Sequence, residues 1–170
     1  MHLLEGEAAA DTSREFTEPP IPTIADVWQA YKFLKPIMHH TVLTPSRTLK
    51  NMTGADIYLK AEHMQRGGSF KARGAAYKVS RLTPAQSAAG VIAASAGNHA
   101  QGVAIAAAQQ KLPCTIVMPE NAPLAKVAAT QEYGANVVLY GATYDDAYQH
   151  CCDLQRESGA TFIHTFDDPD

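Results

Sequence analysis

Val91-Ile-Ala-Ala-Ser-Ala-Gly-Asn-His-Ala-Gln-Gly102 joins a short apolar run to an alanine-rich segment through a glycine-containing turn. The run 91–94 predicts a buried strand, and residues 99–110 predict a helix. A strand that passes into a helix through a short turn is the first part of a strand-helix-strand unit. This stretch therefore predicts an α/β fold.

The same alternation continues toward the C-terminus. Further apolar runs of strand length lie at 114–118, 136–140 and 161–164. Between them, one helix is predicted from Pro123 to a cap at Gly134, and a second from 144 to 158 with a cap at Gly159. Strands and helices that alternate through short loops predict a doubly wound parallel sheet with right-handed connections.

The chain is expected to have four parts. The polar, acidic start is predicted to be a mobile tail, and the segment after it to contain a helix at 24–34 capped by Thr23, a strand at 55–60 and a helix from Ser69. A small parallel α/β domain able to fold alone follows, and then a short return segment. The parts are 1–22, 23–87, 88–166 and 167–170.

Composition narrows the class of protein. The chain has 170 residues, of which 46% are hydrophobic and 18% charged, so a globular core is expected. A net charge of −3 without a basic run argues against nucleic acid and against an acidic membrane surface as partners. Neither a membrane span nor a secretory signal is recognisable, so a cytoplasmic location is expected.

The cysteines suggest neither a disulfide framework nor a metal site. Cys151 and Cys152 are adjacent inside a helical pattern, and Cys114 is remote from them. Histidine, cysteine and carboxylate residues lack the spacing of zinc ligands, so no metal is expected.

A single lysine stands out in Gly68-Ser-Phe-Lys-Ala-Arg-Gly-Ala75. Lys71 follows a glycine pair that lets a flat ligand approach the backbone, and it falls in the first turn of a predicted helix. An amine in that position could form a Schiff base, with Phe70 as a wall for a ring. The alternative is a solvated helix lysine, which is the interpretation given to Lys60, Lys78 and Lys126.

The turn at 95–99 is a candidate anion site. Backbone N–H groups at a helix start bind anions, and Ser95, Asn98 and His99 add side-chain donors that suit a carboxylate. The alternative is a purely structural turn in which Asn98 caps the helix.

These motifs belong to a longer pattern. The segments 60–62, 65–75 and 97–100, followed by matches through Val117-Met-Pro119 to Phe166-Asp-Asp-Pro169, resemble the threonine/serine ammonia-lyases (threonine dehydratases) collinearly over about residues 40–170. This family belongs to the fold-type II pyridoxal-phosphate enzymes, which have the tryptophan synthase β-like fold. The resemblance implies that the chain holds the small domain and the N-terminal part of the large domain.

The resemblance also implies roles for individual residues. Lys71 corresponds to the catalytic lysine that binds pyridoxal 5′-phosphate, with Phe70 and Asn98 as further cofactor contacts, the asparagine at the ring 3′-hydroxyl. Ser95, Gly97, Asn98 and His99 correspond to the loop that binds the substrate carboxylate. The implied reaction is deamination of the small amino acids L-threonine and L-serine to 2-oxobutanoate and pyruvate, in a homo-oligomer, with isoleucine biosynthesis as one expected role.

Family members are about twice this long, and their glycine-rich phosphate loop corresponds to sequence beyond residue 170. We therefore expect a partial chain with weak cofactor affinity of its own. Two alternatives stay open. One is a non-catalytic α/β module that binds a partner subunit or a small anion. The other is an enzyme like serine racemase, against which Ala96 counts because racemases usually carry a serine there.

Overall fold

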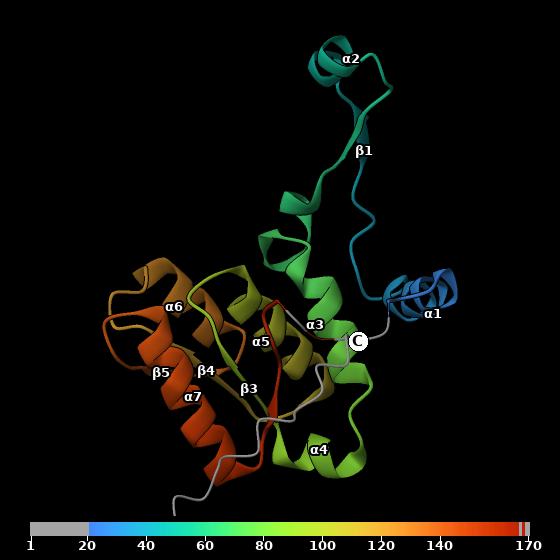
Figure 1. Ribbon diagram of the computed structural model, residues 1–170. Coiled ribbons are helices and arrows are strands. Elements are labelled where there is room, and N and C mark those ends of the chain that lie inside the picture. The colour runs from blue at the N-terminus through green and yellow to red at the C-terminus, as the bar shows by residue number, and fades with distance from the viewer. Residues whose placement is uncertain (1–20, 167, 169–170) are drawn as a thin grey trace, which may run out of the picture.

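A computed structural model describes residues 21–166 and residue 168. The predicted tail at 1–22 lies outside the described residues except for its last two, and so does the predicted return at 167–170 except for Asp168. Figure 1 shows an α/β body from which a thin hairpin carrying a short helix projects. None of the described helices is long and apolar enough to cross a membrane.

The body is built on a parallel sheet of four strands in the order β5-β4-β3-β6. This confirms the predicted parallel α/β fold. The last strand ends two residues earlier than predicted, because the Ile163 carbonyl bonds to a histidine side chain instead of continuing the ladder. The strands are β3 (Val91–Ala94), β4 (Cys114–Met118), β5 (Asn136–Leu139) and β6 (Thr161–Phe162).

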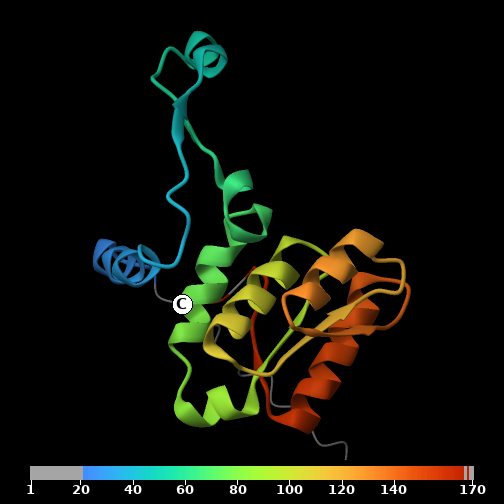
Figure 2. The same cartoon turned by 180° about the vertical axis from the view of Figure 1, so that it is seen from behind.

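Helices cover both faces of this sheet, as Figures 1 and 2 show from opposite sides. Three helices pack together on one face: α3 (Lys71–Ser80), α5 (Asn98–Gln110) and α6 (Leu124–Glu132). On the other face α7 (Tyr144–Ser158) buries Ala147 and Cys151 against β3 and β4. The sheet is therefore doubly wound, with a separate apolar cluster on each face.

The closest helix pair is α3 and α5. Their contact consists mainly of small side chains, with Ala72, Ala75 and Ala76 of α3 buried against the alanine-rich face of α5. Small side chains allow two helix backbones to approach closely. As a result, the helix that begins at Lys71 is part of the same core as the strand and turn at 91–99. The predicted division at residue 88 cuts through this core, and it stays a prediction.

The N-terminal part is an extension from this body. The predicted first helix is present as α1 (Ile24–Leu34), with a capping box between Thr23 and Asp26. The hairpin of β1 (Leu43–Pro45) and β2 (Tyr58–Lys60) encloses α2 (Arg47–Thr53). Sequence reasoning did not find β1 or α2, and it placed the start of β2 three residues too early.

Short elements connect the hairpin to α3, and α3 to the first strand of the parallel sheet. Two single-turn 3-10 helices, η1 (Glu62–Met64) and η2 (Arg66–Gly68), lead from β2 to α3. After α3, the helix α4 (Pro84–Ala89), which was not predicted, leads into β3. The Glu62 carboxylate accepts two hydrogen bonds of 2.8 Å from the Arg73 guanidinium and one of 2.6 Å from the Thr41 hydroxyl. These bonds attach the hairpin to α3.

Candidate active site

The site lies where the sheet changes its direction of winding. From β3 the chain passes through α5 to β4 on one side, whereas β6 pairs with the opposite edge of β3. In open α/β sheets, ligands bind beyond the carboxyl ends of the strands at such a switch point. The turn at 95–99 follows β3 and residues 163–166 follow β6, so both segments meet at this point.

The helix that carries Lys71 begins at Lys71, two residues later than predicted. Ser69 is extended, with φ −163° and ψ 167°, and Phe70 is the N-cap residue. Gly67 and Gly68 have φ values of 68° and 70°, a region that favours glycine. The start at Ser69 was wrong because these two glycines turn the chain and leave Ser69 outside the helix. Lys71 is nevertheless in the first turn.

The Lys71 side chain points into an open pocket of about 180 Å³. Its Nζ donates a 2.7 Å hydrogen bond to the Thr165 carbonyl. The same nitrogen lies 5.6 Å from the ring centre of Phe70 and 5.4 Å from that of Phe166. Phe70 is 61% exposed, so its ring is accessible to a ligand in this pocket. The two aromatic rings near the amine could stack on a flat ring bound to it.

The turn at 95–99 presents backbone donors. The Gly97 N–H donates to the Ser95 hydroxyl at 3.2 Å, and Gly97 is the N-cap residue of α5. The alternative in which the Asn98 side chain caps the helix is therefore wrong, since Asn98 is the first residue of α5 and no side chain caps this end. The first N–H groups of a 13-residue helix consequently remain for an anion.

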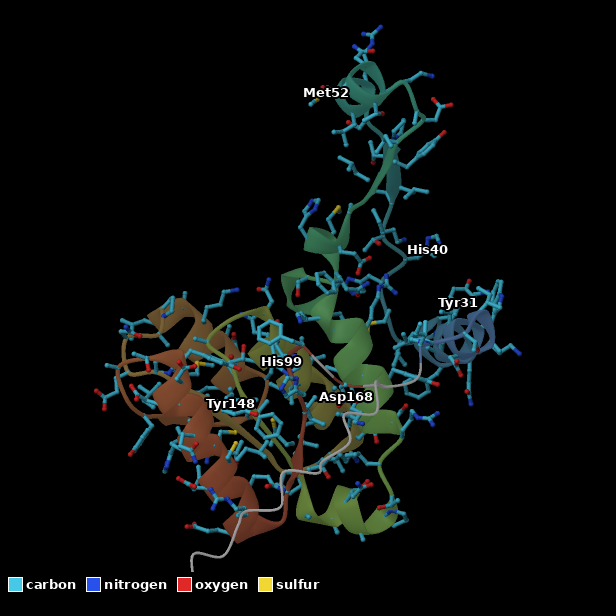
Figure 3. The ribbon with its side chains drawn as sticks, viewed as in Figure 1. Tyr31, His40, Met52, His99, Tyr148 and Asp168 are labelled. Atoms are coloured by element: carbon cyan, nitrogen blue, oxygen red, sulfur yellow. The ribbon has the colours of Figure 1, made fainter. Side chains whose placement is uncertain are left out.

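His99 joins this turn to the strand on the other side of the switch point. Its side chain is buried at 6% exposure, and Nε2 lies 2.9 Å from the Ile163 carbonyl, to which it donates. Burial lowers the pKa of His99, and the charges of Lys71 and His164 lower it further, although the bond to Ile163 opposes the shift. His99 is therefore neutral near pH 7. Figure 3 shows it at the centre of the molecule, between α3 and α7.

Asn98 is exposed, and its Oδ1 accepts a 2.9 Å hydrogen bond from the Nζ of Lys126 in α6. Lys126, Lys60 and Lys78 were all interpreted as solvated lysines, and each has a partner. Lys60 donates to the Thr41 carbonyl at 2.6 Å, and Lys78 forms a 2.8 Å ion pair with Asp168. The local sequence around these three lysines does not indicate which partner each one has.

The pocket brings together three of the predicted site residues: Phe70, Lys71 and His99. Ser95, Gly97 and Asn98 lie beside it in the turn. Sequence reasoning missed the segment after β6, whose carbonyl groups at Ile163 and Thr165 hold His99 and Lys71. Its position beyond a half-buried strand next to β3 was an available signal.

The residues present fit part of pyridoxal phosphate. An amine for the aldehyde, aromatic faces for the ring and a helix N-terminus for a carboxylate are in place. Among residues 21–166 and 168, those lining the pocket do not form a glycine-rich phosphate cradle. No cluster of three or more potential metal ligands occurs in this described part.

Residues 34–170 match the family model of the pyridoxal-phosphate dependent enzymes. The chain belongs to this family. The cofactor of the family, pyridoxal phosphate, is the one that the sequence predicted. Among curated proteins, this family member is 48% identical over 147 residues to an L-threonine ammonia-lyase of Thermotoga maritima, covering 86% of the chain and 37% of that protein. It is 49% identical over 145 residues to an L-threo-3-hydroxyaspartate ammonia-lyase of a Pseudomonas species, covering 85% and 46%.

Solved structures of fold-type II enzymes confirm the fold class. The processed form of a threonine deaminase from Solanum lycopersicum is 36% identical with a TM-score of 0.76, over 89% of this chain and 43% of that one. Maize serine racemase is 33% identical with a TM-score of 0.78, over 85% and 44%. The chain of this family member thus spans less than half the length of these relatives.

Proposed function

We propose that this chain provides the lysine and the carboxylate loop of a pyridoxal-phosphate dependent ammonia-lyase that deaminates L-threonine, and L-serine as well. The observation that carries the proposal is the position of the Lys71 amine, in a pocket shared with His99 beside the free N-terminus of α5. The names and identities of the threonine ammonia-lyase and threonine deaminase relatives support it.

Each residue then has a chemical task. Lys71 would hold the cofactor through its amine and, once released by the substrate amine, take the proton from the substrate α-carbon. When bound, pyridoxal phosphate would supply the electron sink for the pair left on the α-carbon, and return of that pair would expel the β-hydroxyl as the leaving group. The product amino group is lost to water as ammonia.

The substrate is oriented by the turn at 95–99. Backbone N–H groups of the α5 N-terminus would bind its carboxylate together with the Ser95 hydroxyl and the Asn98 amide. His99 is neutral and bound to Ile163, so its task would be to fix this turn against β6. Asn98 would also donate to the ring hydroxyl of the cofactor.

The relatives favour elimination but include other reactions. Serine racemase is a structural neighbour, yet Ala96 removes the hydroxyl that a racemase would use as acid and base on the opposite ring face. A relative in Staphylococcus aureus is named a catabolic L-threonine dehydratase, which favours threonine degradation over the isoleucine biosynthesis expected earlier.

Assembly is part of the proposal. Large apolar side chains are exposed on α1 and on the β1–β2 hairpin, including Trp28, Leu43 and Tyr58. Such surfaces mark contacts with other protein. We propose a homo-oligomer for the whole protein, which sedimentation analysis would test. A module without catalysis would show the same apolar surface, so assembly does not decide between the two functions.

The deciding experiment is chemical trapping. The purified chain is mixed with pyridoxal phosphate, reduced with borohydride, digested and mapped for the labelled peptide. We expect label on Lys71, and none on the peptide after Lys71→Arg. Lys78→Arg is the matched control, because Lys78 lines the same pocket and sits in an ion pair with Asp168. Label spread over surface lysines without preference for Lys71, at pyridoxal phosphate concentrations high enough to offset weak affinity, would contradict the proposal and favour the non-catalytic module.

A further inference from the structure

Lys126 makes the contact that links the carboxylate loop to α6. Its Nζ donates a 2.9 Å hydrogen bond to Oδ1 of Asn98, the first residue of α5. Lys126 is half-buried, and its backbone is held in place, since its carbonyl accepts a 2.8 Å bond from the Thr130 hydroxyl. Thr130 is fully buried. The backbone of Lys126 is therefore fixed, and only its side chain has to be ordered for the ammonium to reach Asn98.

The position of Lys126 is electrostatically unfavourable for α6 itself. It is the third residue of that helix, whose first turn contains no acidic residue. A cation near the positive end of a helix dipole is destabilising by a few tenths of a kcal/mol or more. The N-terminus of α5 adds a second positive end nearby. Helix stability does not explain a lysine here, whereas the bond to Asn98 does.

The chemistry of the two groups fixes the direction of the Asn98 amide. An ammonium only donates hydrogen bonds, and in an amide only the oxygen accepts them. With Oδ1 held by Lys126, the amide nitrogen with its two N–H donors is the end of the side chain that remains available to a ligand. The cation also draws electron density toward Oδ1, which makes these N–H groups stronger donors.

We propose that Lys126 is a positioning residue, which fixes Asn98 as a donor toward an oxyanion on the bound ligand. If the proposed function holds, on which the identity of the ligand rests, that oxyanion is the ring hydroxyl oxygen of pyridoxal phosphate. The contact between Lys126 and Asn98 exists without the cofactor, so it is tested separately from binding.

The first measurement uses the chain without cofactor. The side-chain amide resonances of Asn98 are identified in ¹H–¹⁵N spectra by their loss in Asn98→Ala. We expect Lys126→Met to shift them, and Lys126→Arg, which keeps a donor and a positive charge, to retain most of the original shift. Lys32→Met, which replaces an exposed lysine on the distant helix α1, should leave them unchanged. Unchanged resonances in Lys126→Met would overturn the proposal.

The second measurement compares two probes, pyridoxal phosphate and its 3-O-methyl ether, by borohydride-trapped label at Lys71 as a function of probe concentration. Comparing the ratio of the two affinities between wild type and variant cancels the intrinsic reactivity of each aldehyde. Lys126→Met should reduce the wild-type preference for the free hydroxyl about fivefold to tenfold, the usual net effect of a single hydrogen bond. Lys126→Arg should restore it.

The two measurements can contradict the positioning role and the proposed function independently of each other. An equal preference in wild type and Lys126→Met, with Lys71 labelled in both, would overturn the positioning role and leave the proposed function intact. If both probes label surface lysines without preference for Lys71 in the wild-type chain, the proposed function fails, and the amide resonances alone decide whether Lys126 positions Asn98.

Discussion

A β-carbon added at Gly102 of α5 would lie 3.1 Å from the carbonyl carbon and 3.1 Å from the carbonyl oxygen of Lys71. The backbone that carries the candidate catalytic lysine therefore rests directly on a glycine of the helix that follows the turn at 95–99. Both halves of the candidate site are positioned by this one helix crossing.

Gly102→Ala should destabilise the protein by about 1–3 kcal/mol, the usual cost of overpacking, because the neighbouring atoms are backbone and cannot rotate away. Gly74→Ala is the control. Gly74 lies in α3 with no atom within 4 Å of an added β-carbon, so the better helix propensity of alanine should stabilise it by up to about 1 kcal/mol. Urea unfolding measures both variants. Equal effects of the two substitutions would contradict the close crossing.

The ion pair of Glu62 and Arg73 should make stability depend on acid pH. Hydrogen bonds from Arg73 and Thr41 lower the pKa of Glu62 from 4.5 to about 2. Because the folded pKa is depressed, this stabilisation is complete above pH 4.5 and is lost as the pH falls toward 2. The free energy of unfolding of wild type should drop in this window, and Glu62→Gln should lack this component. A titration of Glu62 near 4.5 in carboxyl NMR spectra would refute the prediction.

His99 should make the free energy of unfolding depend on pH in a second range, above the range in which Glu62 titrates. Burial lowers its pKa below 6.5 in the folded protein, so the unfolded chain binds a proton first as the pH falls below this value. The wild-type free energy of unfolding should therefore decrease below about pH 6.5. In His99→Gln, the amide can still donate to the Ile163 carbonyl but cannot take up a proton. Unfolding curves at several pH values test this, and an identical decrease in both proteins would show that other groups cause it.

The three cysteines should react in a fixed order. Burial raises the pKa of Cys114 and of Cys151 to about 12, whereas Cys152 is half-buried. Iodoacetamide should thus modify Cys152 first in the folded protein, and the other two only after unfolding. Mass spectrometry of the peptides measures the order, and Cys152→Ser should leave the folded protein almost unreactive. Early modification of Cys151 would indicate that α7 separates from the sheet.

The elements of the body were predictable because each combines an apolar run with a clear stop signal. α7 was predicted at its observed bounds, since Thr143 with Asp146 forms a capping box at its start and Gly159 turns the chain at its end. The β1–β2 hairpin carried no such signal. Its strands are only three residues long and exposed, so neither alternation nor burial marks them.

Residues of the candidate site could be singled out from the sequence where the local pattern marks them, as at Lys71 and at the turn from Ser95 to His99. The contacts of the site were not predictable where a backbone carbonyl accepts the hydrogen bond. Thr165 and Ile163 hold Lys71 and His99 through main-chain oxygens, which every residue has. The partner of Lys126 depends on how α6 sits beside α5, which is a tertiary relationship that a single sequence does not encode in its local pattern.

The hydrogen bond between Lys71 and the Thr165 carbonyl has a kinetic consequence. When the amine bonds to an aldehyde carbon it gives up the N–H groups with which it donates to the Thr165 carbonyl. Capture of a ligand therefore involves two steps, attachment at the amine and release of the segment at 163–166. At low ligand concentration the observed rate would rise in proportion to concentration. At high concentration it would level off at the rate of this release, and that plateau would report the mobility of the segment beyond β6.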